Sequence, residues 1–181
     1  MAKLLIPGLR AYTVDQRFFA GSYPGGATED RAHDTLNALW RHGVSVFISL
    51  MEEDEHLRYG QLPQDYEAFF PDVEDTKQAA PQMLRFPIRD MAVPDRSFLK
   101  QILDVIDAQL EQGRGVYLHC LGGVGRTGTV VGCWLARHGI AQGEPALHEI
   151  NRLREYDPML DLPSPQTEAQ RRMVQSWSPG E

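Results

Sequence analysis

Residues 115–128 read GVYLHCLGGVGRTG and join two different structural patterns. Gly115 to His119 is a short, largely apolar run with the composition of a central β-strand. Arg126 to His138 carries apolar residues nearly all round a helical turn, which predicts a buried helix that ends at Gly139. The residues between the two patterns therefore form a loop that leads from the end of a strand into the first turn of a helix.

This loop has the features of an anion-binding site. Successive backbone N–H groups in such a loop point into one concave place, and the helix adds the positive end of its dipole. The loop glycines allow backbone conformations that a side chain would forbid, and those between the cysteine and the arginine are Gly122, Gly123 and Gly125. No Gly-Lys-Ser/Thr sequence ends the loop, so nucleotide binding of the ATPase kind is disfavoured.

A thiol stands at the beginning of the loop and an arginine at its end. Amide dipoles, the helix end and the guanidinium would all favour the thiolate form of Cys120. Arg126 offers a planar fork that can hold two phosphate oxygens, including those of a transition state. Together they predict phosphoryl transfer to sulfur followed by hydrolysis, with no metal and no other cofactor. The ordinary alternative is a buried core cysteine beside a glycine turn, but the combination at a strand–helix junction is much less common by chance.

The segment from His119-Cys120 to Arg126-Thr127 matches the His-Cys-five residues-Arg-Ser/Thr signature of the protein tyrosine phosphatase superfamily. The chain resembles the small dual-specificity-type members, most of all between Phe86 and Gly139. The resemblance implies that Thr127 supports the leaving thiolate and that His119 is a buried structural residue, not a base. It also implies that the substrate phosphate is bound by Leu121, Gly122, Gly123, Val124, Gly125 and Arg126.

A proton donor near the leaving oxygen would assist this reaction. The family carries its acid on a loop with the pattern Pro-Ile-x-Asp, and residues 87–90 read Pro-Ile-Arg-Asp, so the resemblance assigns this role to Asp90. Asp95 is the competing aspartate, but it stands where the N-cap of the following helix is expected. Asp90 is therefore predicted to be the catalytic acid and Asp95 the helix cap.

Three weaker signals leave alternatives open. The segment from Gln166 to Gln170 resembles the one that positions the hydrolytic water in tyrosine phosphatases, although glutamines on an exposed helix face are the more ordinary interpretation. Residues 52–55 are all acidic but lack an ordered ligand spacing, which favours a solvated loop near the mouth of the site over a metal site. Cys133 could pair with Cys120, but its place inside a buried helix favours a core thiol.

The remaining patterns alternate between strands and helices. Further strands are predicted at 17–23, 44–50 and 82–86, and further helices at 28–42, 64–70, 95–112, from Pro145 and from Ser164-Pro165. This order predicts an α/β fold with a small, mostly parallel central sheet and helices on both faces. A length of 181 residues suits one such phosphatase domain over residues 1–181.

Composition restricts the classes of partner. The formal net charge of −7 gives no basic footprint for nucleic acid or for an acidic membrane. No run approaches the roughly 20 apolar residues of a membrane span. Two cysteines are too few for a disulfide framework, and a cytoplasmic location is the expectation.

The length of the chain and the neutral residues of the loop favour a phosphoprotein or phosphopeptide substrate. The short chain shows no evident phosphotyrosine-clamping loop, which favours the dual-specificity type, acting on phosphotyrosine, phosphoserine and phosphothreonine. Lipid phosphatases of the superfamily often place lysines in the loop where this chain has Leu121 and Val124. A phosphate-recognising scaffold would be expected to lack the cysteine, the arginine or the acid. Sulfurtransferases and arsenate reductases also use cysteine in an anion cradle, but fit the Asp90 segment less well.

Overall fold

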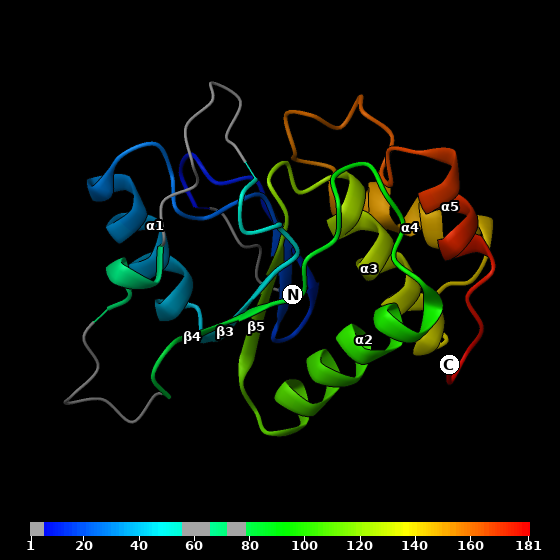
Figure 1. The fold of residues 1–181 in the computed structure, drawn as a ribbon, viewed down its shortest axis with the longest axis horizontal. Helices are drawn as coiled ribbons and strands as arrows, with labels where there is room; N and C mark the ends of the chain where they lie inside the picture. The colour runs from blue at the N-terminus through cyan, green and yellow to red at the C-terminus, as the bar shows by residue number, and fades with distance from the viewer. Residues whose placement is uncertain (1–5, 56–65, 72–78) are drawn as a thin grey trace.

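The computed structural model describes residues 6–55, 66–71 and 79–181. Within them, a sheet of five strands runs in the order β1-β2-β5-β3-β4 across the middle of the molecule (Figure 1). The central strands are parallel to one another, and only β1 runs antiparallel to its neighbour β2. The strand bounds are β1 Ala11–Asp15, β2 Phe18–Gly21, β3 Val44–Ser49, β4 Gln82–Arg85 and β5 Gly115–His119.

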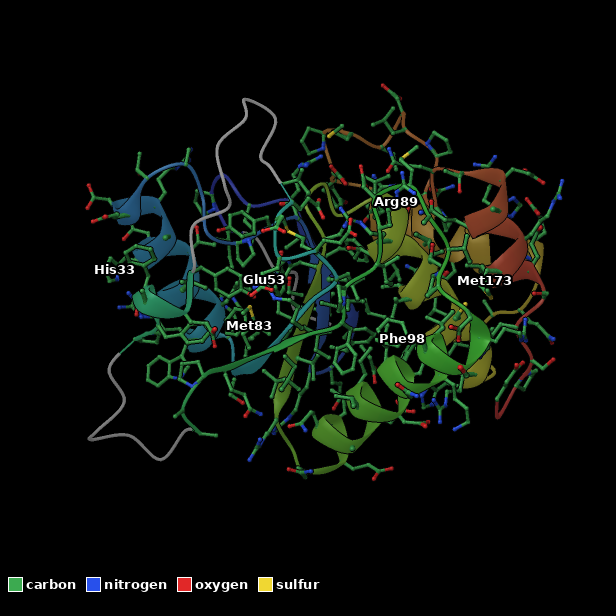
Figure 2. All side chains as sticks on the ribbon, in the orientation of Figure 1. His33, Glu53, Met83, Arg89, Phe98 and Met173 are labelled. Atoms are coloured by element: carbon green, nitrogen blue, oxygen red, sulfur yellow. The ribbon has the colours of Figure 1, made fainter. Side chains whose placement is uncertain are left out.

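Helices cover both faces of the sheet. Helix α1 (Glu29–Arg41) and the 3₁₀ turn η1 (Tyr66–Phe69) lie on one side. The other side is covered by α2 (Arg96–Glu111), α3 (Gly125–Arg137), α4 (Glu144–Leu153) and α5 (Glu168–Gln175) (Figure 1). Side chains fill the space between the layers (Figure 2). The predicted fold class is confirmed.

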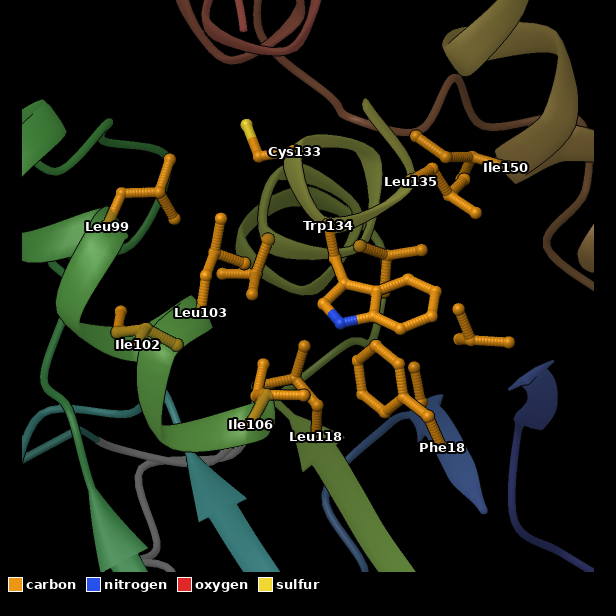
Figure 3. Packing of buried hydrophobic residues seen from close by; sticks show 14 of the residues in the cluster. Phe18, Leu99, Ile102, Leu103, Ile106, Leu118, Cys133, Trp134, Leu135 and Ile150 are labelled. Atoms are coloured by element: carbon orange, nitrogen blue, oxygen red, sulfur yellow. The ribbon is translucent and has the colours of Figure 1, made fainter. Parts of the chain in front are cut away.

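The two cores follow from the alternation of side chains along the buried strands. Phe47 and Tyr117 face α1 and η1, whereas the next residues, Ile48 and Leu118, face the opposite helices. The larger core includes Trp134 of α3, whose ring meets that of Phe18 edge-on at 5.1 Å between centroids (Figure 3). A strand buried on both faces is rich in apolar residues along its length, which is why β3 and β5 were recognisable in the sequence.

Helix α3 is buried over nearly its whole length, as its apolar composition predicts. It packs between the sheet and the pair α4 and α5, and Gly132 allows the close approach. A Cβ added at Gly132 would lie 2.6 Å from a methyl carbon of Val174 and 2.9 Å from Ile150. The helix that carries the arginine of the loop is therefore fixed on all sides.

The structure differs from the sequence-based expectations in two places. The strand expected at 17–23 is β2, and its partner β1 was not predicted; β1 is a short edge strand with an irregular register between Thr13 and Asp15. The last helix begins at Glu168 and not at Ser164-Pro165, because Thr167 is its N-cap.

The short helix expected at 64–70 is η1, and residues 64 and 65 lie outside the described part. Loops expected at 51–60 and 72–81 also lie partly outside it.

Among the helices that the structure describes, none combines the length and the apolar character required to cross a membrane.

Candidate active site

The candidate site lies at the carboxyl edge of the parallel strands, where ligands commonly bind in α/β sheets. Strand β5 leads into the loop Cys120–Val124, and the loop leads into α3. Two neighbouring segments are tied to it: Leu50 N donates to the carbonyl oxygen of His119 (2.8 Å), and Tyr23 N donates to that of Leu121 (3.1 Å). The segments after β2 and β3 are thereby brought beside the loop.

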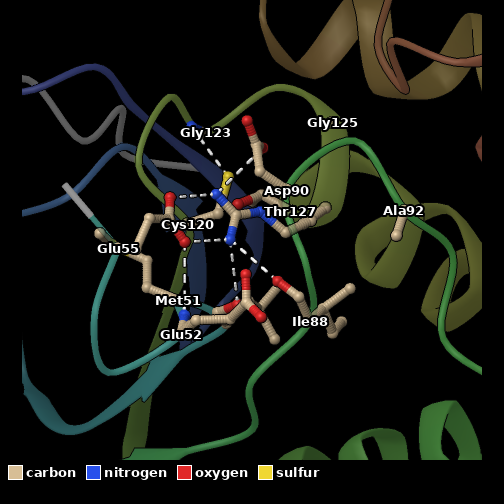
Figure 4. A network of polar contacts seen from close by, with 12 residues as sticks. Met51, Glu52, Glu55, Ile88, Asp90, Ala92, Cys120, Gly123, Gly125 and Thr127 are labelled. Carbon is tan, nitrogen blue, oxygen red and sulfur yellow. Dashed lines mark hydrogen bonds and ion pairs between the residues drawn. The ribbon is translucent and has the colours of Figure 1, made fainter. Parts of the chain in front are cut away.

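The loop bends around the sulfur of Cys120. This side chain is buried, and the amide of Gly123 donates a hydrogen bond to its sulfur over 3.2 Å (Figure 4). Gly123 has a φ of +70°, and a Cβ there would lie 2.5 Å from the backbone carbon of Gly21. Only glycine fits both conditions. The sulfur therefore lies inside the loop, beside the amide of Gly123.

Arg126 connects the loop to two segments that follow β3 and β4. Its Nη1 donates to the carbonyl oxygens of Ile88 (3.0 Å) and Leu50 (3.3 Å). Its Nη1 and Nη2 contact the carboxylate of Glu55 at 2.5 and 2.6 Å, and Nη2 lies 3.1 Å from Oδ1 of Asp90 (Figure 4). Burial opposes the charge of Arg126, but the Glu55 hydrogen bonds and the nearby negative groups outweigh it and raise the pKa of the guanidinium. The arginine is charged and directed at the site.

The two candidate aspartates have different surroundings. Asp90 lies in a turn in which Ala92 N donates to the carbonyl oxygen of Arg89 (3.0 Å), and its exposed carboxylate faces Arg126. Asp95 is the N-cap of α2, as predicted, and accepts hydrogen bonds from Phe98 N and the Ser97 hydroxyl. These hydrogen bonds lower the pKa of Asp95, which is unfavourable for a proton donor.

His119 is completely buried, which agrees with the structural role that the sequence suggested. Its Nε2 lies 2.8 Å from the hydroxyl of Tyr66, and its Nδ1 lies 3.3 Å from the carbonyl oxygen of Cys120. Burial lowers the pKa of His119 to about 3, so the imidazole is neutral at pH 7. Thr127 is also buried, and its hydroxyl is directed at the carbonyl oxygen of Gly21 (3.5 Å), which places it between the loop and β2.

Gln166, which precedes α5, and Gln170, which lies within it, do not share one environment. Gln170 is fully buried: its Oε1 accepts from Thr167 N (3.1 Å), and its Nε2 donates to the carbonyl oxygen of Ala92 (3.0 Å). The interpretation as an exposed helix face is therefore wrong for Gln170. Gln166 is directed at the start of α3: a Cβ added to Gly125 would lie 2.7 Å from the Oε1 of Gln166. The Thr-x-x-Gln spacing is a capping-box pattern, which could have identified the hydrogen bond between Thr167 N and the side chain of Gln170.

The acidic segment contains a residue of the site that sequence reasoning missed. Glu52, Glu53 and Asp54 are exposed, as a solvated loop predicts, but Glu55 lies against Arg126. A contact between residues 71 positions apart leaves no local pattern in the sequence. Over the described ranges, no three His, Cys, Asp or Glu side chains are grouped so that they could hold a metal ion. Cys133 lies fully inside α3, and burial raises its pKa, as expected of a core thiol.

Comparison with known proteins agrees with this geometry. Residues 22–140 match the family model described as "Polymorphic toxin system, DSP-PTPase phosphatase". The chain belongs to this phosphatase family. The matched range includes the Cys120 loop, Glu55 and the Asp90 turn, and excludes Gln166 and α5. Membership of the dual-specificity type, which the sequence suggested, is thereby confirmed.

Two curated relatives are distant in sequence, and this chain matches less than half of each. The chain is 30% identical to "Putative tyrosine phosphatase 067L" of Invertebrate iridescent virus 3 over 132 residues, which are 69% of this chain and 44% of the viral one. It is 28% identical over 102 residues to "Phosphatidylinositol 3,4,5-trisphosphate 3-phosphatase cnrN" of Dictyostelium discoideum, covering 55% of this chain and 15% of that one. The chain thus spans less than half the length of these relatives.

Solved structures share the fold of this phosphatase. Kinase associated phosphatase superposes with a TM-score of 0.69 at 18% identity, over 92% of this chain and 90% of that one. The active form of Tk-PTP superposes with a TM-score of 0.67 at 24% identity, over 96% and 97% of the two chains. At these identities the likeness concerns the fold alone.

Proposed function

We propose that this chain hydrolyses phosphomonoesters without a metal, through a phosphocysteine intermediate on Cys120, and that its substrates are phosphotyrosine and phosphoserine or phosphothreonine in proteins. One observation carries the proposal: a buried sulfur that accepts an amide hydrogen bond stands at the beginning of the loop, and Arg126, in the first turn of the helix that follows, is directed at the same site. A nucleophile and an anion-binding fork in one loop supply both requirements of phosphoryl transfer to sulfur.

In the first step, the Cys120 thiolate attacks phosphorus while Arg126 and the loop amides hold the phosphoryl oxygens. A bond from phosphorus to sulfur forms, the bond from phosphorus to the ester oxygen breaks, and Asp90 gives its proton to the leaving oxygen. In the second step, water attacks phosphorus and gives a proton to Asp90. The phosphorus–sulfur bond breaks, the thiolate is restored with support from the Thr127 hydroxyl, and inorganic phosphate leaves.

The charges around the pocket support a substrate with a single phosphate. Leu121 and Val124 of the loop are neutral, and the carboxylates of Glu55 and Asp90 stand at Arg126. A second phosphate group next to these carboxylates would be repelled. One distant relative is named as a phosphoinositide phosphatase, so a lipid phosphate is the comparison that the assay must include. A reducing compartment keeps a reactive thiol usable, which supports a cytoplasmic location.

The first test is hydrolysis of para-nitrophenyl phosphate with EDTA present, followed by a panel of phosphotyrosine, phosphoserine and phosphothreonine peptides and a phosphoinositide. We expect turnover of the aryl phosphate and the peptides, with inhibition by orthovanadate. Cys120→Ser should abolish turnover while phosphate binding remains, and Arg126→Ala should lose both. Full activity of Cys120→Ser, or activity restricted to the phosphoinositide, would contradict the proposal.

A further inference from the structure

The segment that follows α5 is fastened to the first turn of α2. Arg96, the first residue of α2, forms two hydrogen bonds with the carboxylate of Glu181, from Nε to Oε1 at 2.8 Å and from Nη2 to Oε2 at 2.5 Å. The same guanidinium donates to the hydroxyl (3.0 Å) and to the carbonyl oxygen (3.2 Å) of Ser176. Its central carbon lies 4.6 Å from the centre of the Trp177 ring. One side chain thus connects α2 with three residues of the segment 176–181.

We propose that the segment 176–181 is a strap that fixes the far end of the Asp90 turn, and that Arg96 is the positioning residue through which it acts. This inference rests on the proposed phosphatase function, in which Asp90 is the acid. Arg96 acts through the backbone that joins the Asp90 turn to α2, and not by contact with the reacting atoms. The strap thereby sets where the carboxylate of Asp90 lies relative to the leaving oxygen.

The strap is itself held on the body of the molecule. Trp177 is fully buried in the larger core, and Gly180 N donates to the carbonyl oxygen of Arg137 at the end of α3 (2.8 Å). Oε2 of Glu181 also accepts from Ser178 N (3.2 Å), which closes a turn within the strap. Figure 1 shows this segment, in red, running from α5 past the start of α2. The groups that Arg96 contacts are therefore fixed by the core and by α3.

The two ends of the Asp90 turn are held by different means. Before the turn, Arg126 donates to the carbonyl oxygen of Ile88 (3.0 Å). After it, the chain enters α2, where the hydrogen bonds to the Asp95 cap lie within the first turn of the helix itself. The first turn of a helix has few internal hydrogen bonds and opens easily. Arg96 fastens this turn to another part of the molecule, which the cap does not.

The strap also continues a contact that α5 makes with the same stretch of chain. Gln170 of α5 donates to the carbonyl oxygen of Ala92 (3.0 Å), and the strap follows α5 directly. Two successive points after Asp90, at Ala92 and at Arg96, are thus held by one continuous part of the chain. Movement of α5 and the strap would therefore move the acid.

A surface ion pair that only adds stability is the ordinary alternative. The side chains of Arg96 and Glu181 are 41% and 31% exposed, and a single pair at such a position contributes little. This contact is more than a single pair, because the two-pronged carboxylate contact, the bonds to Ser176 and the ring of Trp177 fix the guanidinium together. Its place, at the point where the Asp90 turn becomes a helix, favours a role in positioning.

The test compares Arg96→Met with the matched control Arg172→Met. Methionine keeps a long side chain over the Trp177 ring but has no fork for Glu181, and Arg172 makes an exposed ion pair with Glu168 on α5 (3.0 Å). We expect Arg96→Met to lower kcat for an alkyl phosphate about threefold to tenfold, because this leaving group needs the proton. The kcat for para-nitrophenyl phosphate and both KM values should change less than about twofold. Arg172→Met should change none of these.

Two further measurements separate positioning from stability. In the Asp90→Ala background, Arg96→Met should have little further effect on the alkyl phosphate, since the acid is already absent. With Asp90 present, hydrogen exchange at the Ala92 amide, which closes the turn, should accelerate relative to amides in the middle of α3. Arg96→Lys keeps the charge without the fork and should lie between Arg96→Met and the wild type.

The outcomes that overturn the inference are specific. They are an unchanged rate with the alkyl phosphate, equal losses with both phosphates, a loss that persists in Asp90→Ala, or unchanged exchange at Ala92. If Arg96→Met does not fold, Glu181→Gln takes its place, with a smaller effect of the same pattern expected. A wild type without phosphatase activity would contradict the proposed function alone, and the exchange at Ala92 would then decide whether the strap holds the turn.

Discussion

At position 123, the backbone conformation and the neighbouring backbone atoms permit only glycine. Gly123 combines a φ of +70° with backbone atoms of Gly21 and Ser22 within 2.5–2.7 Å of where a Cβ would stand, whereas the neighbouring Gly122 has open space there. We expect Gly123→Ala to lower the free energy of unfolding by more than about 2 kcal/mol, from the left-handed conformation and the contact together. Gly122→Ala should cost much less. Denaturant unfolding of both variants measures the difference, and equal losses would contradict this account of the loop.

Asp90 and Asp95 offer a second comparison at the residue scale. Asp90→Ala should slow the hydrolysis of alkyl phosphates by about 10²–10⁴-fold, because a poor leaving group needs the proton. It should affect para-nitrophenyl phosphate much less, because that leaving group is already stable as an anion. Asp95→Ala should leave this ratio unchanged and lower the free energy of unfolding by about 1 kcal/mol through loss of the α2 cap. If Asp95→Ala instead shows the leaving-group dependence, the assignment of the acid is wrong.

At the scale of elements, the turn that carries Asp90 is held from two sides. Arg126 donates to the carbonyl oxygen of Ile88, and Gln170 of α5 donates to that of Ala92, so Asp90 lies between two anchored residues. Helix α5 therefore contributes to the site through the position of the loop, although it follows the matched family range in the chain.

The Gln170 contact leads to a prediction for α5 and the loop together. Gln170→Ala removes the donor to Ala92 and the acceptor for Thr167 N, and we expect a loss of about 1–3 kcal/mol in the free energy of unfolding. Hydrogen exchange at the Ala92 amide, which closes the Asp90 turn, should accelerate. Gln175→Ala is the control on the same helix, because its contact to Glu144 is exposed, and it should change both quantities little. Unchanged exchange in Gln170→Ala would contradict the role of α5 in holding the loop.

For the whole molecule, the buried imidazole of His119 makes stability depend on pH. Burial lowers its folded-state pKa to about 3 from the ordinary value of 6.5, so between these values the unfolded chain binds more protons. The contribution of His119 is fully present above pH 6.5 and is lost as the pH falls towards 3, at up to about 1.4 kcal/mol per pH unit. His119→Asn should therefore lose less stability than the wild type between pH 6.5 and 4.5 in denaturant titrations. Parallel pH profiles of the two proteins would contradict this.

The sequence by itself determined the features that have a local pattern. Apolar and β-branched composition predicted the buried strands β3 and β5, and an apolar surface nearly all round predicted α3. Hydrophobic residues at helical spacing predicted α1 and α2, because each buries one face. The spacing from Cys120 to Arg126 identified the loop, and Asp95 was recognised as a cap because capping is a contact within one turn. The edge strand β1 was not predicted: its residues are in part only half-buried, and it lacks the continuous apolar composition that marks β3 and β5.

Only the tertiary structure decided the contacts between distant segments. Glu55 looked like part of a solvated acidic run, and Gln170 looked like an exposed helix residue, yet both are anchors of the site. Their partners, Arg126 and Ala92, stand 71 and 78 positions away. Such a contact depends on how the parallel strands bring their carboxyl ends to one edge and on how α5 packs across α3. Those arrangements follow from the packing of the whole chain, which no short stretch of residues encodes.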